Sequence, residues 1–156
     1  MTMQAFSARM LASALLISLL AAPARAQGPH LGGHGGYNVD VNHGLIGAQM
    51  LFPIARNVEL YPSFDYYFQD GATRFGFSGD VKLRFPMGGG SAPYLGGGLN
   101  VLHASAGGSS DTDTGWDFLF GLESRRGSTH PFVEGRVLLH DASQFQFVAG
   151  LNFTLY

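Results

Sequence analysis

The sequence predicts an all-β protein, an eight-stranded antiparallel up-and-down transmembrane β-barrel preceded by a cleaved signal peptide. Three observations predict it: side chains that alternate almost without exception from Thr73 to Pro86, a first segment like an export signal, and a low content of charged residues. Period-two alternation gives a β-strand one polar and one apolar face. At about 3.3 Å per residue the Thr73 to Pro86 strand spans roughly 45 Å, which suits a tilted strand that crosses a membrane.

Residues 1–26 have the pattern of a secretory signal peptide. Arg9 lies in a polar first part, an apolar run follows from Met10 to Ala22, and residues 24–26 read A-R-A, an A-x-A cleavage site. The apolar run is too short for a membrane-spanning helix. We therefore expect one mature domain, residues 27–156. Cleavage removes Arg9 and Arg25, so the formal net charge moves from −2 to about −4.

The composition favours a membrane barrel over a soluble domain. Charged residues are 13% of the chain, about half the usual share, while glycine (23) and phenylalanine (13) are abundant. No later segment holds 18 consecutive apolar residues. The chain has no cysteine, so its stability must come from a hydrogen-bonded sheet rather than from disulfides. Its acidic charge and lack of a basic patch argue against a nucleic-acid partner.

Four strands are expected in the first half of the mature chain. Each alternates leucine, phenylalanine, tyrosine or other bulky residues with small or polar ones, and each ends at a turn sequence. Pro62 lies inside the third, although proline cannot donate to a strand ladder and usually marks an edge or a bulge. The expected ranges are His30 to Asp40, Leu45 to Ile54, Val58 to Phe68 and Thr73 to Pro86.

Four more strands follow in the second half. The same alternation continues, with turns around Gly88 to Ser91 and Arg126 to Thr129. Between the fifth and sixth strands, the polar stretch from Gly107 to Gly115 predicts the longest loop. The expected ranges are Pro93 to Ser105, Trp116 to Arg125, Phe132 to His140 and Phe145 to Tyr156. Eight consecutive hairpin-linked strands close most simply into a barrel without free edges.

Alternation alone leaves two barrels open: a membrane barrel with its apolar face outside, or a soluble lipocalin-like carrier with that face around a lipophilic ligand. The polar face is rich in glycine, serine and asparagine, which suits the narrow interior of an eight-stranded barrel. A water-facing exterior would hold more lysine, and Lys82 is the only one. The bulky aromatic face suits contact with lipid, so the membrane barrel is favoured.

Three stretches resemble the small outer-membrane β-barrels of Gram-negative bacteria, the OmpA-type and OmpX-type eight-stranded group. They read P-Y-L-G-G-G-L at Pro93 to Leu99, P-F-V-E-G-R at Pro131 to Arg136, and G-L-N-F-T-L-Y at the C-terminus. The resemblance implies residence in the cell outer membrane as a monomer, in contact with membrane lipid and lipopolysaccharide. It also implies that Tyr156 belongs to the signal read by the outer-membrane assembly machinery. Thr154 and Asn152 depart from the family pattern, which has apolar residues at those positions.

Charged residues of both signs share the predicted lumen. We expect a structural ion-pair network that fills and blocks the barrel, because buried charges must be paired. The alternative, a narrow ion-selective pore, is disfavoured by the small size of an eight-stranded barrel. The expected members are Glu59, Asp65, Arg74, Asp80, Lys82, Arg84, Glu123, Arg125, Glu134 and Arg136.

One element suggests an enzyme instead. His103-Ala104-Ser105 resembles the His-x-Ser element of outer-membrane lipid A deacylases, small barrels with a Ser/His/acid site on the lipid-facing wall. Both residues fall on the apolar face, as such a site requires. The acid would have to be Asp117 or Glu123, and both are expected to face the lumen.

Metal and cofactor sites are not predicted. His30, His34 and His43 lie close together in sequence, but no cysteine or carboxylate completes a zinc set at a typical spacing. Asp111-x-Asp113-x-Gly115 matches the start of a calcium loop without the later ligands. The sequence therefore predicts an integral outer-membrane protein with a structural or surface role, without catalysis and without an open pore. Its connections at Asp40 to Gly44, Gln69 to Ala72, Gly107 to Gly115 and His140 to Ser143 are expected to face outside.

Overall fold

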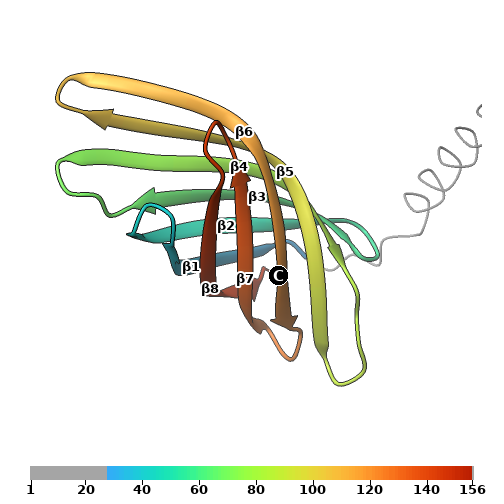
Figure 1. Cartoon of the computed structure of the whole chain (residues 1–156). Coiled ribbons are helices and arrows are strands. Elements are labelled where there is room, and N and C mark those ends of the chain that lie inside the picture. Colours follow the sequence, from blue (N-terminus) through green and yellow to red (C-terminus); the bar gives the residue numbers. More distant parts are fainter. Residues whose placement is uncertain (1–27, 156) are drawn as a thin grey trace, which may run out of the picture.

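The computed structural model describes residues 28–155, which form one closed antiparallel β-barrel (Figure 1). Its strands are β1 (His30–Asn38), β2 (His43–Ala55), β3 (Val58–Tyr67), β4 (Ala72–Arg84), β5 (Ser91–Ala106), β6 (Ser109–Ser124), β7 (Thr129–Leu139) and β8 (Gln144–Thr154). Each strand pairs with the next, and β8 pairs with β1 to close the barrel. The expected signal peptide and Tyr156 lie outside the described residues.

No helix within residues 28–155 is long and apolar enough to cross a membrane.

The apolar face of the sheet points outward. On β4, Phe77 is 55% exposed and Val81 48%, whereas the neighbouring Ser78 and Asp80 are 6% and 0% exposed. The same alternation holds on the other strands, with Trp116, Phe118 and Phe120 of β6 on the outside. A soluble carrier needs the opposite arrangement, with the apolar side chains around an internal cavity. The orientation is therefore the one predicted for a membrane barrel.

The connection between β5 and β6 was predicted wrongly. It is a two-residue turn at Gly107 and Gly108, both with positive φ (58° and 85°), and not a loop from Gly107 to Gly115. Positive φ at both central residues suits the tight turns of β-hairpins, and glycine adopts it without strain. The residues assigned to the loop pair with β5, from Ala106 opposite Ser109 to Asn100 opposite Gly115.

This hairpin is longer than the wall next to it. Strand β6 pairs with β7 only from Trp116 to Glu123, so Ser109 to Gly115 has β5 as its sole strand partner among the described residues. In Figure 1 the hairpin runs out beyond the β7–β8 turn. The β1–β2 and β3–β4 turns lie at the same end of the barrel, which we call the hairpin end, and the chain enters β1 at the other end, which we call the N-terminal end.

Pro62 remains inside β3 and faces outward opposite Gly79 of β4. On its other side, the pairing with β2 is interrupted between Gln49 opposite Ser63 and Phe52 opposite Leu60. A missing amide hydrogen explains this local gap. The strand was thus predicted correctly, and the proline costs only part of one ladder.

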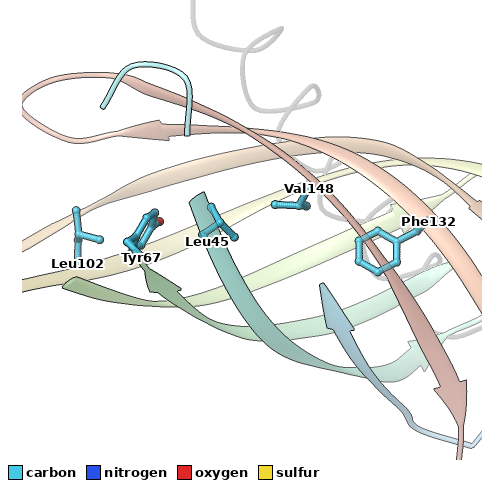
Figure 2. Packing of buried hydrophobic residues seen from close by; sticks show 5 residues of the cluster. All are labelled: Leu45, Tyr67, Leu102, Phe132 and Val148. Carbon is cyan, nitrogen blue, oxygen red and sulfur yellow. The ribbon is translucent and has the colours of Figure 1, made fainter. Parts of the chain in front are cut away.

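The lumen is not polar throughout. Leu45, Tyr67, Leu102, Phe132 and Val148 form a buried apolar cluster inside the barrel, which extends from Leu102 near the hairpin end to Phe132 of β7 (Figure 2). A second cluster consists of Leu51, Tyr61, Tyr94 and Leu119. These groups fill space that would otherwise hold water, and the rings of Tyr61, Tyr67 and Tyr94 also contact lysine or arginine side chains. Charged residues lie on both sides of the second cluster, as Glu59 and Asp65 do on either side of Tyr61 on β3.

Candidate functional site

The barrel interior holds the charged residues predicted for the lumen. Nine of the ten lie on strands at positions that face inward, and Arg125 directly follows β6. Their side chains are buried, with Arg125 the most accessible at 14%. Strand alternation brings them into the lumen from β3, β4, β6 and β7, so residues far apart in sequence meet across the barrel.

Arg136 on β7 is the centre of the network. Its Nη2 and Nε atoms donate to Glu134 Oε1 at 2.8 and 3.2 Å. Its Nη1 atom donates to Asp65 Oδ2 and Ser63 Oγ on β3, each at 3.2 Å. Both carboxylates and the guanidinium are fully or almost fully buried. This cross-lumen pairing ties β7 to β3, which the sheet itself does not bring together.

A relay of polar side chains runs from Asp65 toward the N-terminal end. His34 bridges Asp65 Oδ1 and Gln49 Oε1, with both ring nitrogens at 2.6 Å from their partners. Gln49 Nε2 then donates to Asn152 Oδ1 at 2.7 Å, and Asn152 Nδ2 donates to Glu123 Oε1 at 3.0 Å. The buried amides are thereby satisfied on both sides, as buried polar groups require.

Four further charges lie near the N-terminal end with Glu123, and two of them contact it. Glu123 Oε2 lies 3.5 Å from Lys82 Nζ and 3.4 Å from Arg125 Nη1. Arg125 also lies 3.6 Å from Glu59 Oε1, which pairs with Arg84 Nη2 at 3.2 Å. Two carboxylates are thus shared among three cations. Together with the relay, these contacts form one continuous network from Arg84 to Arg136.

Tyrosine rings line the same part of the lumen, and sequence reasoning did not count them as part of the network. Lys82 Nζ lies 3.7 Å from the centre of the Tyr94 ring and 5.2 Å from that of Tyr61. Tyr94 donates its hydroxyl to Glu134 Oε2 at 2.9 Å. Cation–π contact adds to the ion pairs and fills space between them. The signal was present in the sequence, because Tyr61 and Tyr94 share the strand face of the predicted charges.

Arg74 and Asp80 are not brought into this network. Arg74, toward the hairpin end, donates to Gln144 Oε1 at 2.9 Å and lies over the Tyr67 ring at 5.0 Å. Within residues 28–155, no carboxylate lies at ion-pair distance from Arg74. Likewise, no lysine, arginine or histidine there lies at ion-pair distance from Asp80. Asp80 is instead next to Asp117, a lumen residue that was considered only as a possible catalytic acid.

The two residues of the possible deacylase element lie on the outer face of β5. His103 Nδ1 is 2.8 Å from Thr112 Oγ1, and its ring lies 5.0 Å from that of Phe75. Ser105 stands opposite Ser110. Asp117 and Glu123 face the lumen, as expected. The hydrogen-bond partner of His103 is therefore a hydroxyl group and not the carboxylate that a Ser/His/acid site needs.

The histidines considered for a metal site go to different places. His34 bridges Gln49 and Asp65, whereas His30 packs against His130 with ring centres 5.1 Å apart. Asp111 and Asp113 lie on β6, so they do not form a calcium loop. Within residues 28–155, no group of three or more histidine, cysteine, aspartate or glutamate residues could hold a metal ion.

The barrel is similar to solved outer-membrane barrels. The N-terminal β-barrel domain of Pseudomonas aeruginosa OprF matches with a TM-score of 0.72 at 17% identity, over 83% of this chain and 98% of that one. Neisserial surface protein A, NspA, matches with 0.65 at 13% identity, over 81% and 96%. The outer-membrane enzyme PagL matches with 0.54 at 11% identity, over 81% and 99%.

Sequence comparisons add no closer relationship. No protein-family model matches the chain, and no curated protein sequence matches it. The likeness therefore lies in the fold, which combines eight antiparallel strands, an apolar exterior and a filled polar lumen. The protein is an eight-stranded β-barrel of the outer-membrane type.

Proposed function

We propose that the protein acts as an integral outer-membrane protein with a structural and surface role, without catalysis and without an open pore. The observation that supports this most is the filled lumen, whose largest fully buried side chains include Arg136, Tyr61 and Lys82. An eight-stranded barrel has just enough interior room for side chains. Opening a path for ions would separate buried charges from their partners, at about 3 to 5 kcal/mol for each broken pair.

Membrane lipid is the partner that fits the outer face. Exposed leucine, phenylalanine, valine, isoleucine and tyrosine side chains are spread over it around the barrel. Lipopolysaccharide of the outer leaflet would contact the same face. The closed sheet leaves no strand edge within the lipid-facing band, which supports a monomer. A role of Tyr156 in recognition by the assembly machinery stays a prediction.

The β5–β6 hairpin supports a surface role. Its outer part, from Ser109 to Thr114, carries serine, threonine and aspartate side chains that are exposed except for the half-buried Asp113, and these suit water rather than lipid. If both termini face the periplasm, strand parity places this hairpin outside the cell. It would be the part of the protein that extends farthest from the membrane.

Cell fractionation and gel mobility test this assignment. The full-length protein should be recovered with outer membranes and migrate differently on gels when boiled and unboiled, because the closed hydrogen-bonded sheet resists detergent. Purified barrel added to planar bilayers should produce no conductance steps. Recovery from the soluble periplasm without a mobility shift would refute membrane insertion, and reproducible channels would refute the closed lumen.

A lipid A-modifying enzyme is the second candidate, because His103 and Ser105 share the outer face of β5 and one structural neighbour is an enzyme. We expect Ser105→Ala and His103→Ala to leave lipid A unchanged, since His103 bonds to Thr112 and not to a carboxylate. Mass spectrometry of lipid A from cells with wild type, each variant or no barrel measures this. Loss of an acyl chain that requires either residue would favour the enzyme.

A further inference from the structure

Two carboxyl groups in the lumen lie next to each other, and neither accepts a hydrogen bond from another group of the described residues. Asp80 of β4 and Asp117 of β6 flank Gly98 of β5, which is paired with both. Both aspartates are 0% exposed, and their side chains are within hydrogen-bonding contact of each other. Within residues 28–155, none of their four oxygen atoms meets an N–H or O–H group. Such a pair cannot carry two uncompensated negative charges in a buried site.

The other lumen carboxylates already have their cations. Four lumen carboxylates form ion pairs with four cations. The carboxylates are those of Glu59, Asp65, Glu123 and Glu134, and the cations are Lys82, Arg84, Arg125 and Arg136. Arg74 is six residues from Asp80 along β4, toward the hairpin end, and bonds to Gln144. The lumen thus holds one more carboxylate than lysine and arginine side chains. Arg136 is near enough to act on Asp80 electrostatically, but its guanidinium is bonded to Glu134 and Asp65, and no lysine or arginine among the described residues forms an ion pair with Asp80 or Asp117.

A third buried oxygen without a hydrogen-bond partner belongs to Asn100 of β5. Asn100 is the next inward-facing residue after Gly98 on β5 and is 1% exposed. Its Nδ2 atom donates to Ser78 Oγ on β4 at 2.8 Å, so the carboxamide oxygen on the other side of the group points away from β4. The neighbour on that side is β6, which carries Asp117. This Oδ1 atom is buried and has no partner.

The residue of β5 between the two aspartates is a glycine, so no side chain of β5 separates them. Gly115 faces Asn100 across the β5–β6 pair, and Gly98 separates the two aspartates. A Cβ atom at Gly98 would lie 2.6 Å from Asp80 Oδ1 and 2.0 Å from the Gly79 carbonyl oxygen, so even alanine does not fit there. The backbone of β5 therefore allows the carboxyl groups to approach each other.

We propose that Asp80, Asp117 and Asn100 form a binding site for a hard cation, sodium or calcium, inside the barrel. The set offers only oxygen ligands, two carboxylates and one amide carbonyl, which are the ligands that calcium prefers. A bound cation supplies the missing charge and links β4, β5 and β6 just below the projecting hairpin. The site needs no third acidic or histidine ligand, and water completes the coordination.

The test measures thermal unfolding of the refolded mature barrel in detergent, in choline chloride with a chelator, in sodium chloride, and in calcium chloride. We expect at least one of the two ions to raise the midpoint by about 5 °C or more at saturation. Asp80→Asn should fold, since the amide can donate to Asp117, but should weaken the response to the ion by about tenfold or more. The separate salts tell a sodium site from a calcium site.

Asp111→Asn, on the exposed hairpin, is the matched control and should respond like wild type. Asn100→Ala should also weaken the response to the ion. This variant replaces Asp80→Asn in the test if Asp80→Asn does not fold. If neither ion changes the unfolding midpoint of the wild-type barrel, the two aspartates share a proton instead, and the proposed cation site is wrong. A response that survives Asp80→Asn or Asn100→Ala but disappears in Asp111→Asn would place the ion on the surface and equally overturn the proposal.

Discussion

At the scale of single residues, the barrel depends on a few buried charges that have several partners each. Arg136 is fully buried and satisfies Glu134, Asp65 and Ser63 at once. Taking such charges out of water is costly, and the cost is recovered only when all partners are in place. The main effect of Arg136 is therefore to keep buried carboxylates from being left without a cation, and its own pairing energy contributes less.

Arg136→Met should therefore destabilise the barrel by about 3 to 5 kcal/mol, because it leaves two carboxylates without their cation in the lumen. Unfolding in urea, with the barrel inserted in lipid vesicles, measures the change. Arg56→Gln removes an exposed arginine from the β2–β3 turn and should cost little. Equal effects of the two substitutions would mean that the lumen network contributes no more than a surface charge.

The network could be predicted only as a set of residues. Strand alternation places Glu59, Lys82 and Glu134 in the lumen from sequence alone. It does not tell which side chains meet across the barrel, because this depends on strand tilt and register. The relay through His34 and Gln49 and the contact of Asp80 with Asp117 could not be inferred for that reason.

At the scale of elements, strands that face lipid were easy to locate, and the water-facing part of one strand was not. The strands within the apolar band show both an apolar and a polar face, so their alternation is visible in the sequence. Residues from Ser109 to Thr114 face water on both sides and carry only serine, threonine and aspartate. Without an apolar face this stretch has the composition of a loop, and pairing with β5 makes it a strand.

The outer hairpin should be dispensable for insertion. Deleting residues 104–111 and closing His103 to Thr112 with Asn-Gly keeps the register, because these two residues face each other. The pairing of β6 with β7 begins only at Trp116 and stays intact. We expect the shortened barrel to insert and to keep its heat-dependent gel mobility. Failure to insert would mean that the hairpin is needed for folding of the barrel.

A matched control separates hairpin length from register. Deleting Ser105 alone shifts one strand by one residue, which moves side chains to the opposite face. Either the hairpin turn must rearrange to absorb the change or Trp116 must leave the outer face. This variant should fold less efficiently than the one with the longer deletion, as measured by the fraction of heat-modifiable protein.

At the scale of the whole molecule, the decisive property is which face of the sheet meets lipid. The size and chemistry of the two faces predicted that the apolar side chains point outward, and the fold confirms this orientation. It did not predict how much apolar packing the lumen contains, such as Leu45 with Tyr67 and Leu102. Each of these residues stands singly among small or polar residues on the polar face of its strand. Their contact inside the barrel can therefore be recognised only once the sheet is closed.

Phe77 and Ser78 are adjacent on β4 and test the orientation directly. Phe77 is on the outer face, and Ser78 faces Asn100 in the lumen. An arginine on the lipid face near the bilayer centre costs roughly 2 to 4 kcal/mol, so Phe77→Arg should impair insertion, whereas Phe77→Leu should be tolerated. A soluble barrel with an apolar interior would also suffer from Phe77→Arg, so stability alone does not separate the two models.

Site-directed labels do separate them. The chain has no cysteine, so Phe77→Cys and Ser78→Cys each give a single attachment point for a small fluorophore. In lipid vesicles, quenchers attached to acyl chains should reduce the emission of the label at position 77 and leave that at position 78 nearly unchanged. Membrane depth is the same for neighbouring residues, so only the face of the strand can cause the difference. The opposite order, or no quenching at either position, would place the apolar face inside and contradict the membrane barrel.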